Sequence, residues 1–251
     1  MDSSRTTLVF VGFAPTLVRG DGRVLKLVHA VEASIPGVRL DWEVSDEGAL
    51  RPLSGRDAWL MERLVDGAFP LLCNGDEDRP VTLSGWEKPA AASLGGQPQL
   101  QLHAELSLPP ANIHRVMDVV EGLSEAARAF WAHATPSRAA EVIASQRGRS
   151  SPVPLGLPRL LRADDLTSPV IPHHLGWINF WSAATARALG FPDATRDAEW
   201  LSRSRRTATD GWVVQLTQAP LDLDVPEHLE TLLRAYERFQ VIGGRAPPRN
   251  T

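Results

Sequence analysis

The segment Leu100–Leu108, with the sequence LQLHAELSL, decides the fold because apolar and polar residues alternate along it. One set of positions holds Leu100, Leu102, Ala104, Leu106 and Leu108, and the other holds Gln101, His103 and Glu105. Successive side chains of a β-strand point to opposite faces, so the pattern predicts a strand with one buried and one solvent-facing side. Strands of this kind are typical of antiparallel sheets.

Four further segments have the composition of strands. They are TTLVFVGFAP at 6–15, VRLDWEVS at 38–45, FPLLCN at 69–74 and PVTLSGWE at 80–87. The first is apolar on both faces, which predicts a central strand that is covered on both sides. Because the connections between neighbouring strands are short, we expect all strands before residue 109 to form one sheet.

After Pro109-Pro110 the apolar residues recur at helical spacing, and this predicts a long helix at 110–132. Other helices are expected at 23–35, 57–65, 138–146, 194–204 and 226–239, and a helix end is expected at Gly190. The dipeptide Asp210-Gly211 predicts a two-residue turn between two strands, which either extend the first sheet or form a small second one.

These patterns predict an α+β fold, in which a mixed, largely antiparallel sheet is packed by the helix at 110–132 and the C-terminal helix at 226–239. Residues 1–251 are expected to form a single α+β domain. The alternative is two lobes joined by the Pro/Ser-rich linker at 148–172, which has no periodicity but contains several leucines.

Composition restricts the classes of partner. The chain has 251 residues, 43% of them hydrophobic, which is enough to bury a substantial core. Its formal net charge of −4 argues against a nucleic-acid partner but is compatible with a basic protein partner. A single cysteine excludes an intrachain disulfide. The first residues lack the long apolar stretch of a secretory signal. Their apolar run is also too short to span a membrane, so we expect a cytoplasmic protein.

His173 and His174 are the candidate metal ligands, because Asp164 and Asp165 precede them closely. Adjacent histidines point in different directions in regular structure, which favours a loop with ordinary hydrogen bonds. The chain also lacks a glycine-rich phosphate loop, a G-x-S-x-G motif, an H-E-x-x-H motif and a paired cysteine motif.

Cys73 is the candidate nucleophile, and His103 or His133 would have to reach it through folding. A buried, inert thiol is the favoured interpretation. Asp222 and Asp224 share a face of an extended segment, but Asp224 is better explained as the N-cap of the last helix. We therefore expect no catalytic residue, no metal ion, no cofactor and no convergence of the following residues: Cys73, His103, His133, His173 and His174.

Two aromatic features remain. Trp177 and Trp181 in GWINFWS share a face in either a helix or a strand, and we interpret them as anchors of the core. Asp76, Glu77 and Asp78 form an acidic turn, and Trp86 and Glu87 follow it closely. An exposed acidic turn beside an aromatic residue fits a basic cleft, so these five residues are the predicted partner-binding site.

Three segments carry a family resemblance that extends over almost the whole chain. They are FPLLCNGDEDRPVTLSGWE, LGWINFWSAATARALGFP and RRTATDGWVVQLTQAPLDLDVPEHL, and they resemble an uncharacterised protein family abundant in myxobacteria. The GWINFWS motif and the order of strands and helices also resemble one class of immunity proteins of bacterial polymorphic toxin systems. Members of that class are typically paired with toxins of the restriction-endonuclease fold.

This resemblance implies an antidote that binds a cognate toxin, a nuclease among the candidates, and occludes its active site. An antidote has no catalytic residues, no cofactor and no nucleic-acid or membrane partner, and the resemblance leaves its oligomeric state open. The alternative is a small metal-dependent or thiol hydrolase that uses His173, His174 or Cys73. An enzyme needs convergent polar groups in a concave pocket, whereas an inhibitor presents them on an accessible surface.

Overall fold

A computed structural model describes residues 6–18, 20, 22–63, 69–147, 153–162 and 165–245. These residues form one sheet of ten strands in the order β3-β2-β4-β5-β6-β1-β7-β8-β10-β9. The strands are β1 (Thr6–Pro15), β2 (Trp42–Val44), β3 (Leu50–Pro52), β4 (Phe69–Cys73), β5 (Val81–Lys88), β6 (Gln99–Leu108), β7 (Trp131–Pro136), β8 (Ile178–Trp181), β9 (Arg205–Arg206) and β10 (Trp212–Gln215). Each pairing between them is antiparallel, and the predicted α+β class is confirmed.

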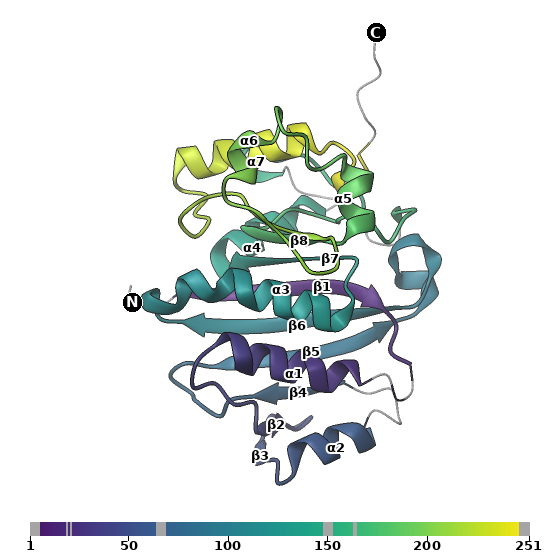
Figure 1. Ribbon diagram of the computed structural model, residues 1–251, viewed down its shortest axis with the longest axis vertical. Coiled ribbons are helices and arrows are strands. Elements are labelled where there is room, and N and C mark those ends of the chain that lie inside the picture. The colour runs from purple at the N-terminus through teal and green to yellow at the C-terminus, as the bar shows by residue number, and fades with distance from the viewer. Residues whose placement is uncertain are drawn as a thin grey trace.

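Seven α-helices accompany the sheet within the described residues. They are α1 (Arg23–Ser34), α2 (Arg56–Arg63), α3 (Val116–Ala127), α4 (Ser137–Ala144), α5 (Ala183–Leu189), α6 (Ala198–Leu201) and α7 (Pro226–Arg238). Figure 1 shows α1 and α3 side by side in front of the central strands, with α2 at one end of the sheet and α6 and α7 at the other. The two central helices therefore seal one face of the sheet.

Strand β1 lies at the centre of the sheet. It pairs with β6 over ten residues, from Thr6 to Pro15, and with β7 over six. Leu8 and Phe10 on its helix-facing side are fully buried, whereas Val9 and Val11 on the second side are half-buried. The predicted central strand is confirmed, but its second face is covered only in part.

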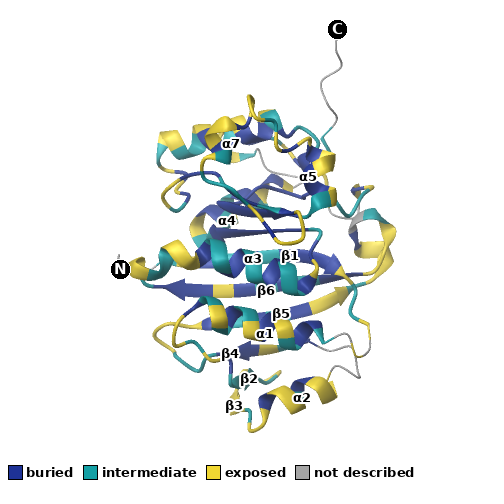
Figure 2. Ribbon diagram, viewed as in Figure 1, coloured by how far each residue is buried: buried dark blue, intermediate teal, exposed yellow. Residues whose placement is uncertain are grey.

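The second face of the sheet is covered over β7, β8 and β10. There, Phe191 and Phe239 each pack edge-to-face on Trp181, with ring centroids 5.0 Å apart. Trp131 stacks on Phe13 at 4.6 Å. Figure 2 shows that burial concentrates in the central strands, while exposed residues are frequent on α2 and α7 and also occur on β5 and β6.

The predicted helix at 110–132 is wrong at both ends. Residues Pro110–Arg115 form a 3-10 helix, and α3 ends at Ala127 because Arg128 takes a left-handed conformation with φ 56°. The chain then enters β7, which the sequence analysis missed. Phe130 and Trp131 continue the helical spacing, but strand pairing with β1 and the stack on Phe13 determine the observed conformation.

The region around the expected linker at 148–172 lies partly outside the described residues. Leu157 and Leu160 within it are buried, while Leu155 and Leu161 are exposed. Strands β7 and β8, on either side of this segment, pair with each other. The single domain over 1–251 stays a prediction. The hairpin around Asp210-Gly211 joins β9 to β10 and extends the sheet, but its connection spans residues 207–211 instead of the expected two residues.

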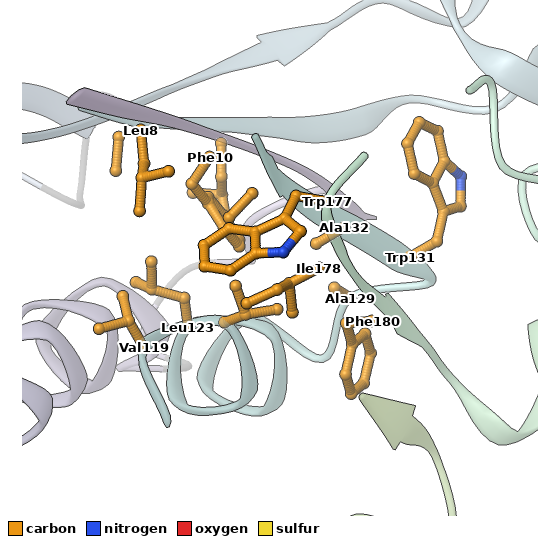
Figure 3. Packing of buried hydrophobic residues seen from close by; sticks show 14 of the residues in the cluster. Leu8, Phe10, Val119, Leu123, Ala129, Trp131, Ala132, Trp177, Ile178 and Phe180 are labelled. Carbon is orange, nitrogen blue, oxygen red and sulfur yellow. The ribbon is translucent and has the colours of Figure 1, made fainter. Parts of the chain in front are cut away.

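Trp177 and Trp181 are both buried, with 2% and 1% of their surface exposed, which confirms their place in the core. Trp181 is in β8, and its neighbours are Phe191 and Phe239. Figure 3 draws Trp177 among Phe10, Leu123 and Ile178, and its Nε1 donates to the carbonyl of Thr217 at 2.8 Å. The two rings therefore fill different parts of the core instead of forming one pair.

We expect Trp177→Ala or Trp181→Ala to lower the free energy of unfolding by about 3–5 kcal/mol, because each leaves a cavity in close-packed surroundings. Chemical denaturation followed by circular dichroism measures this loss. Trp86→Ala is the control, since 45% of the Trp86 surface is exposed, and it should cost about 1 kcal/mol or less. Equal losses at Trp86 and Trp181 would contradict the assignment.

Candidate functional site

The five predicted partner-binding residues do not form one contiguous patch. Asp76, Glu77 and Asp78 are in the turn between β4 and β5, and Trp86 is near the other end of β5. Val81 and Trp86 are five strand positions apart, which corresponds to about 17 Å at the usual rise. The turn and Trp86 are thus separate features of the surface.

Trp86 and Glu87 point to opposite faces, as consecutive strand residues must. Trp86 pairs with Gln101, and its ring lies 6.5 Å from that of His103 on the face without the central helices. Glu87 pairs with Leu100 and accepts a hydrogen bond from Thr16 Oγ1. Glu87 is therefore not part of the surface that carries Trp86.

The acidic turn has a defined internal structure. The Asp76 carboxylate accepts hydrogen bonds from the backbone N–H of Arg79 at 2.9 Å and of Asp78 at 3.0 Å. These bonds, led by the one from Arg79, hold the pKa of Asp76 below its usual value. Asn74 Oδ1 accepts from the N–H of Val81 at 3.0 Å. Asp76 and Asn74 therefore shape the turn, and Glu77 and Asp78 are its exposed charges.

The tryptophan that contacts this turn is Trp42 of β2. Gly75 has φ +69°, and a Cβ at this position would lie 2.5 Å from Trp42 Nε1. The glycine is required both by the left-handed conformation and by this close approach. Trp42 belongs to the same face as Trp86, because it pairs with Cys73, which pairs with Thr82 on β5. The turn therefore borders that face.

We use the name open face for the side of β5, β6 and β1 that lacks the central helices. The strand register places these residues on it: Val9, Val11, Thr82, Ser84, Trp86, Gln101, His103 and Glu105. All of them are half-buried or exposed, while the residues between them are buried. The solvent-facing side predicted for Gln101, His103 and Glu105 is thus observed.

The expectation that the histidines stay apart is wrong. His133 Nε2 lies 2.7 Å from His174 Nε2, so one ring donates a hydrogen bond to the other. His133 Nδ1 also lies 3.1 Å from Thr135 Oγ1, and the ring of His173 is 5.7 Å from that of His174. Because β7 was not recognised in the sequence, its His133 could not be placed beside His174.

This histidine pair is neutral. Burial lowers the pKa of His133 to about 3 and that of His174 well below its usual value, and positive charge on Arg147 acts in the same direction. His174 Nδ1 is buried and has no hydrogen-bond partner within the described residues. A Cβ on Gly176 would lie 2.7 Å from His133 Nδ1, so the segment before β8 packs directly on the pair.

The remaining sequence candidates lie elsewhere. Cys73 is buried in β4, as predicted, and one strand separates it from His103. Asp224 does not cap the last helix, because Val225 is the residue that precedes α7 and it makes no side-chain cap. The carboxylate of Asp224 instead pairs with Arg138 at 2.5 Å. Asp164 is outside the described residues. Among those described, no three His, Cys, Asp or Glu side chains could together hold a metal ion.

One partly buried charge cluster was missed by the sequence analysis. The guanidinium of Arg56 contacts the carboxylates of Glu32, Asp41 and Asp57. Although burial opposes its charge, the hydrogen bonds to Glu32 and Asp57 raise the pKa of Arg56. The cluster joins α1, α2 and the segment before β2, and Arg39 adds a second cation that contacts Glu32 and Asp41. Such pairing supports a structural role.

The family model described as Domain of unknown function (DUF5953) matches residues 19–247. The chain belongs to the DUF5953 family. No curated protein matches this DUF5953 chain in sequence. The further resemblance to immunity proteins stays a prediction.

Among solved structures, the DUF5953 chain is similar to the Pseudomonas aeruginosa T6SS protein PA0821. The TM-score is 0.56 at 11% sequence identity, and the match covers 98% of this chain and 78% of that one. At this identity the similarity shows a shared fold. Within the described part of the DUF5953 chain, no helix has the length and apolar character needed to cross a membrane.

The neutral histidine pair predicts a loss of stability in acid. The unfolded chain takes up protons at the usual histidine pKa of 6.5, while folded His133 does so only near 3. The contribution of the pair to stability is therefore fully present above pH 6.5 and is lost as the pH drops, at up to about 1.4 kcal/mol per pH unit for His133. Urea unfolding between pH 7 and about pH 4.5 measures this dependence.

The double variant His133→Gln/His174→Gln should lose this part of the pH dependence, because glutamine does not titrate. His103→Gln, on the open face, should keep the slope of the parent. Carboxylate titration contributes to all three proteins alike. Equal slopes in the parent and the double variant would contradict a neutral buried pair.

Proposed function

We propose that this DUF5953 chain is an immunity protein, which binds a cognate bacterial toxin and neutralises it by occluding the active site. The observation that carries the proposal is the likeness to a T6SS protein over 98% of the chain. That protein is described as a T6SS protein, which is compatible with a role in bacterial competition. In such competition, a toxin and its antidote occur together. The GWINFWS resemblance points to the same class.

The architecture suits occlusion. An antidote needs a rigid scaffold and an accessible surface, and it needs no reaction centre. The ten-stranded sheet, sealed by α1 and α3 on one face, supplies the scaffold. The exposed carboxylates Glu77 and Asp78 offer negative charge in a turn whose shape is held by Asp76. Charge of this kind accelerates association with a basic partner.

In this proposal the chain is not an enzyme and uses no cofactor. The His133–His174 pair is buried and neutral, which suits packing better than proton transfer to a substrate. Cys73 is buried on another strand. No specific observation favours the metal-dependent or thiol hydrolase.

The proposed partner is a toxin with a basic active-site cleft, such as a nuclease. A nuclease binds the phosphates of its substrate through cationic side chains. When the carboxylates of the turn enter such a cleft, they occupy the positions that these phosphates would take. A net charge of −4 favours this partner over nucleic acid itself. The toxin is the predicted partner, and no membrane is involved.

The direct test uses the product of the gene beside the one that encodes this chain. Expressed alone in a bacterial host, that product should stop growth, and co-expression of the DUF5953 chain should restore it. The two purified proteins should form a complex that abolishes the activity of the toxin. Binding without loss of toxicity would contradict occlusion, and absence of binding would contradict the function itself.

We expect Glu77→Lys/Asp78→Lys to weaken this binding about tenfold or more and to reduce its salt dependence. Asp76 is left intact because its replacement would disrupt the turn. The matched control is Glu230→Lys/Glu237→Lys on α7, at the other end of the sheet. Calorimetric titration at two salt concentrations measures both effects. Equal losses in both double variants would mean that only net charge matters.

A further inference from the structure

We infer that the open face of β5, β6 and β1, bordered by the acidic turn, receives the partner, and that the partner presents basic and apolar side chains there. This inference rests on the proposed function and specifies its surface. It moves the centre of the site from the turn to residues that lie side by side on neighbouring strands.

The first step is the unequal covering of the sheet. Strand β1 is buried on its helix-facing side, where Leu8 and Phe10 meet the residues of α1 and α3. On the opposite side, aromatic rings cover the sheet from β10 as far as Phe13 of β1, which stacks on Trp131. Val9 and Val11, on the same side, are only half-buried. The open face is thus a central part of the sheet that the described residues leave partly uncovered.

The second step is the composition of this face. A solvated sheet face normally carries polar side chains, as Thr82, Ser84 and Gln101 do here. Trp86, however, exposes 45% of its surface, and Val9 and Val11 stand two strands away from it. An exposed tryptophan is typical of the residues that contribute most to binding in protein interfaces.

The third step is charge. Glu105 is exposed in the middle of the open face, and no described residue pairs with its carboxylate. The bordering turn adds Glu77 and Asp78. Two cations lie nearby, because Arg79 contacts Asp76 at 3.5 Å, and Lys88 follows Trp86 on the same side of β5 with its Nζ 5.8 Å from the centre of the Phe13 ring. The four carboxylates of Glu105 and the turn outnumber these two cations, so the face with its border attracts cationic groups.

These observations select among occupants. A second copy of the chain would bring two acidic rims together and is disfavoured by repulsion. Nucleic acid is disfavoured for the same reason. A basic protein can place a guanidinium on the Trp86 ring and another beside Glu105, with apolar atoms over Val9 and Val11. The cognate toxin of the proposed function is such a protein.

Two variants test the surface against the purified product of the neighbouring gene. Trp86→Ala removes the aromatic anchor, and we expect binding to weaken about thirtyfold, as at other central aromatic residues. Glu105→Lys reverses the central charge, and we expect a loss of similar size. Met61→Ala on α2 and Glu230→Lys on α7 are the controls, and both should bind as the parent does. Met61 is 40% exposed, close to the value for Trp86.

Oxidative footprinting gives an independent measurement of the same contact. Of the eight tryptophans, four are buried, three are half-buried and Trp86 is exposed. Trp86 should therefore oxidise most readily in the free protein and become protected severalfold in the complex. Sedimentation of the free chain tests for a second copy on this face. Protection of Trp86 in a self-associated chain without partner would overturn the inference.

The outcomes separate the two proposals. If the parent fails to bind the neighbouring gene product, the proposed function is wrong. If the parent binds and protects cells, but Trp86→Ala and Glu105→Lys bind as tightly as the controls, the function stands and the open face is the wrong surface. Circular dichroism of each variant confirms that it folds.

Discussion

The structure depends on the double pairing of β1. One ten-residue strand hydrogen-bonds to β6 along its whole length and to β7 along most of it, so it joins the N-terminal strands to the C-terminal ones. Its helix-facing side chains pack beneath α1 and α3, and its Phe13 stacks on Trp131 of β7. A defect here would disturb both halves of the sheet together, because no other strand contacts both β6 and β7.

The same strand marks the boundary between two environments on the second face. Towards β7 and β8, aromatic side chains and a neutral histidine pair fill the space densely, and Gly176 allows the chain to pass close to His133. Towards β6 and β5, the side chains meet solvent, and Trp86, His103 and Glu105 lie on this side of the sheet. The dry region stabilises the fold, and the wet region is available for recognition.

The sequence predicted those elements whose signal is local. The alternation in Leu100–Leu108 correctly gave a strand with one wet face, and the helical spacing of α1 and α7 correctly gave amphipathic helices. Asp210-Gly211 correctly marked a turn. In each case the pattern covers the residues that make the structure, so no distant contact is needed to interpret it.

The missed features depend on distant contacts. The helical spacing that runs on to Trp131 hides the end of α3, and pairing with β1 forms a strand instead. Without β7, His133 could not be placed beside His174, although both histidines were considered. The contact between Gly75 and Trp42 joins residues 33 positions apart, and sequence proximity therefore favoured Trp86 as the neighbour of the turn.

Strand alternation has a consequence for how this protein can change. On β5 and β6, every second residue packs under the helices, and the residues between them face outward. A substitution at an outward position leaves the inward neighbours in place, so the surface can vary while the interior stays constant. Proteins that must follow a changing partner benefit from such independence. In this fold, diversification of the surface is decoupled from maintenance of the core.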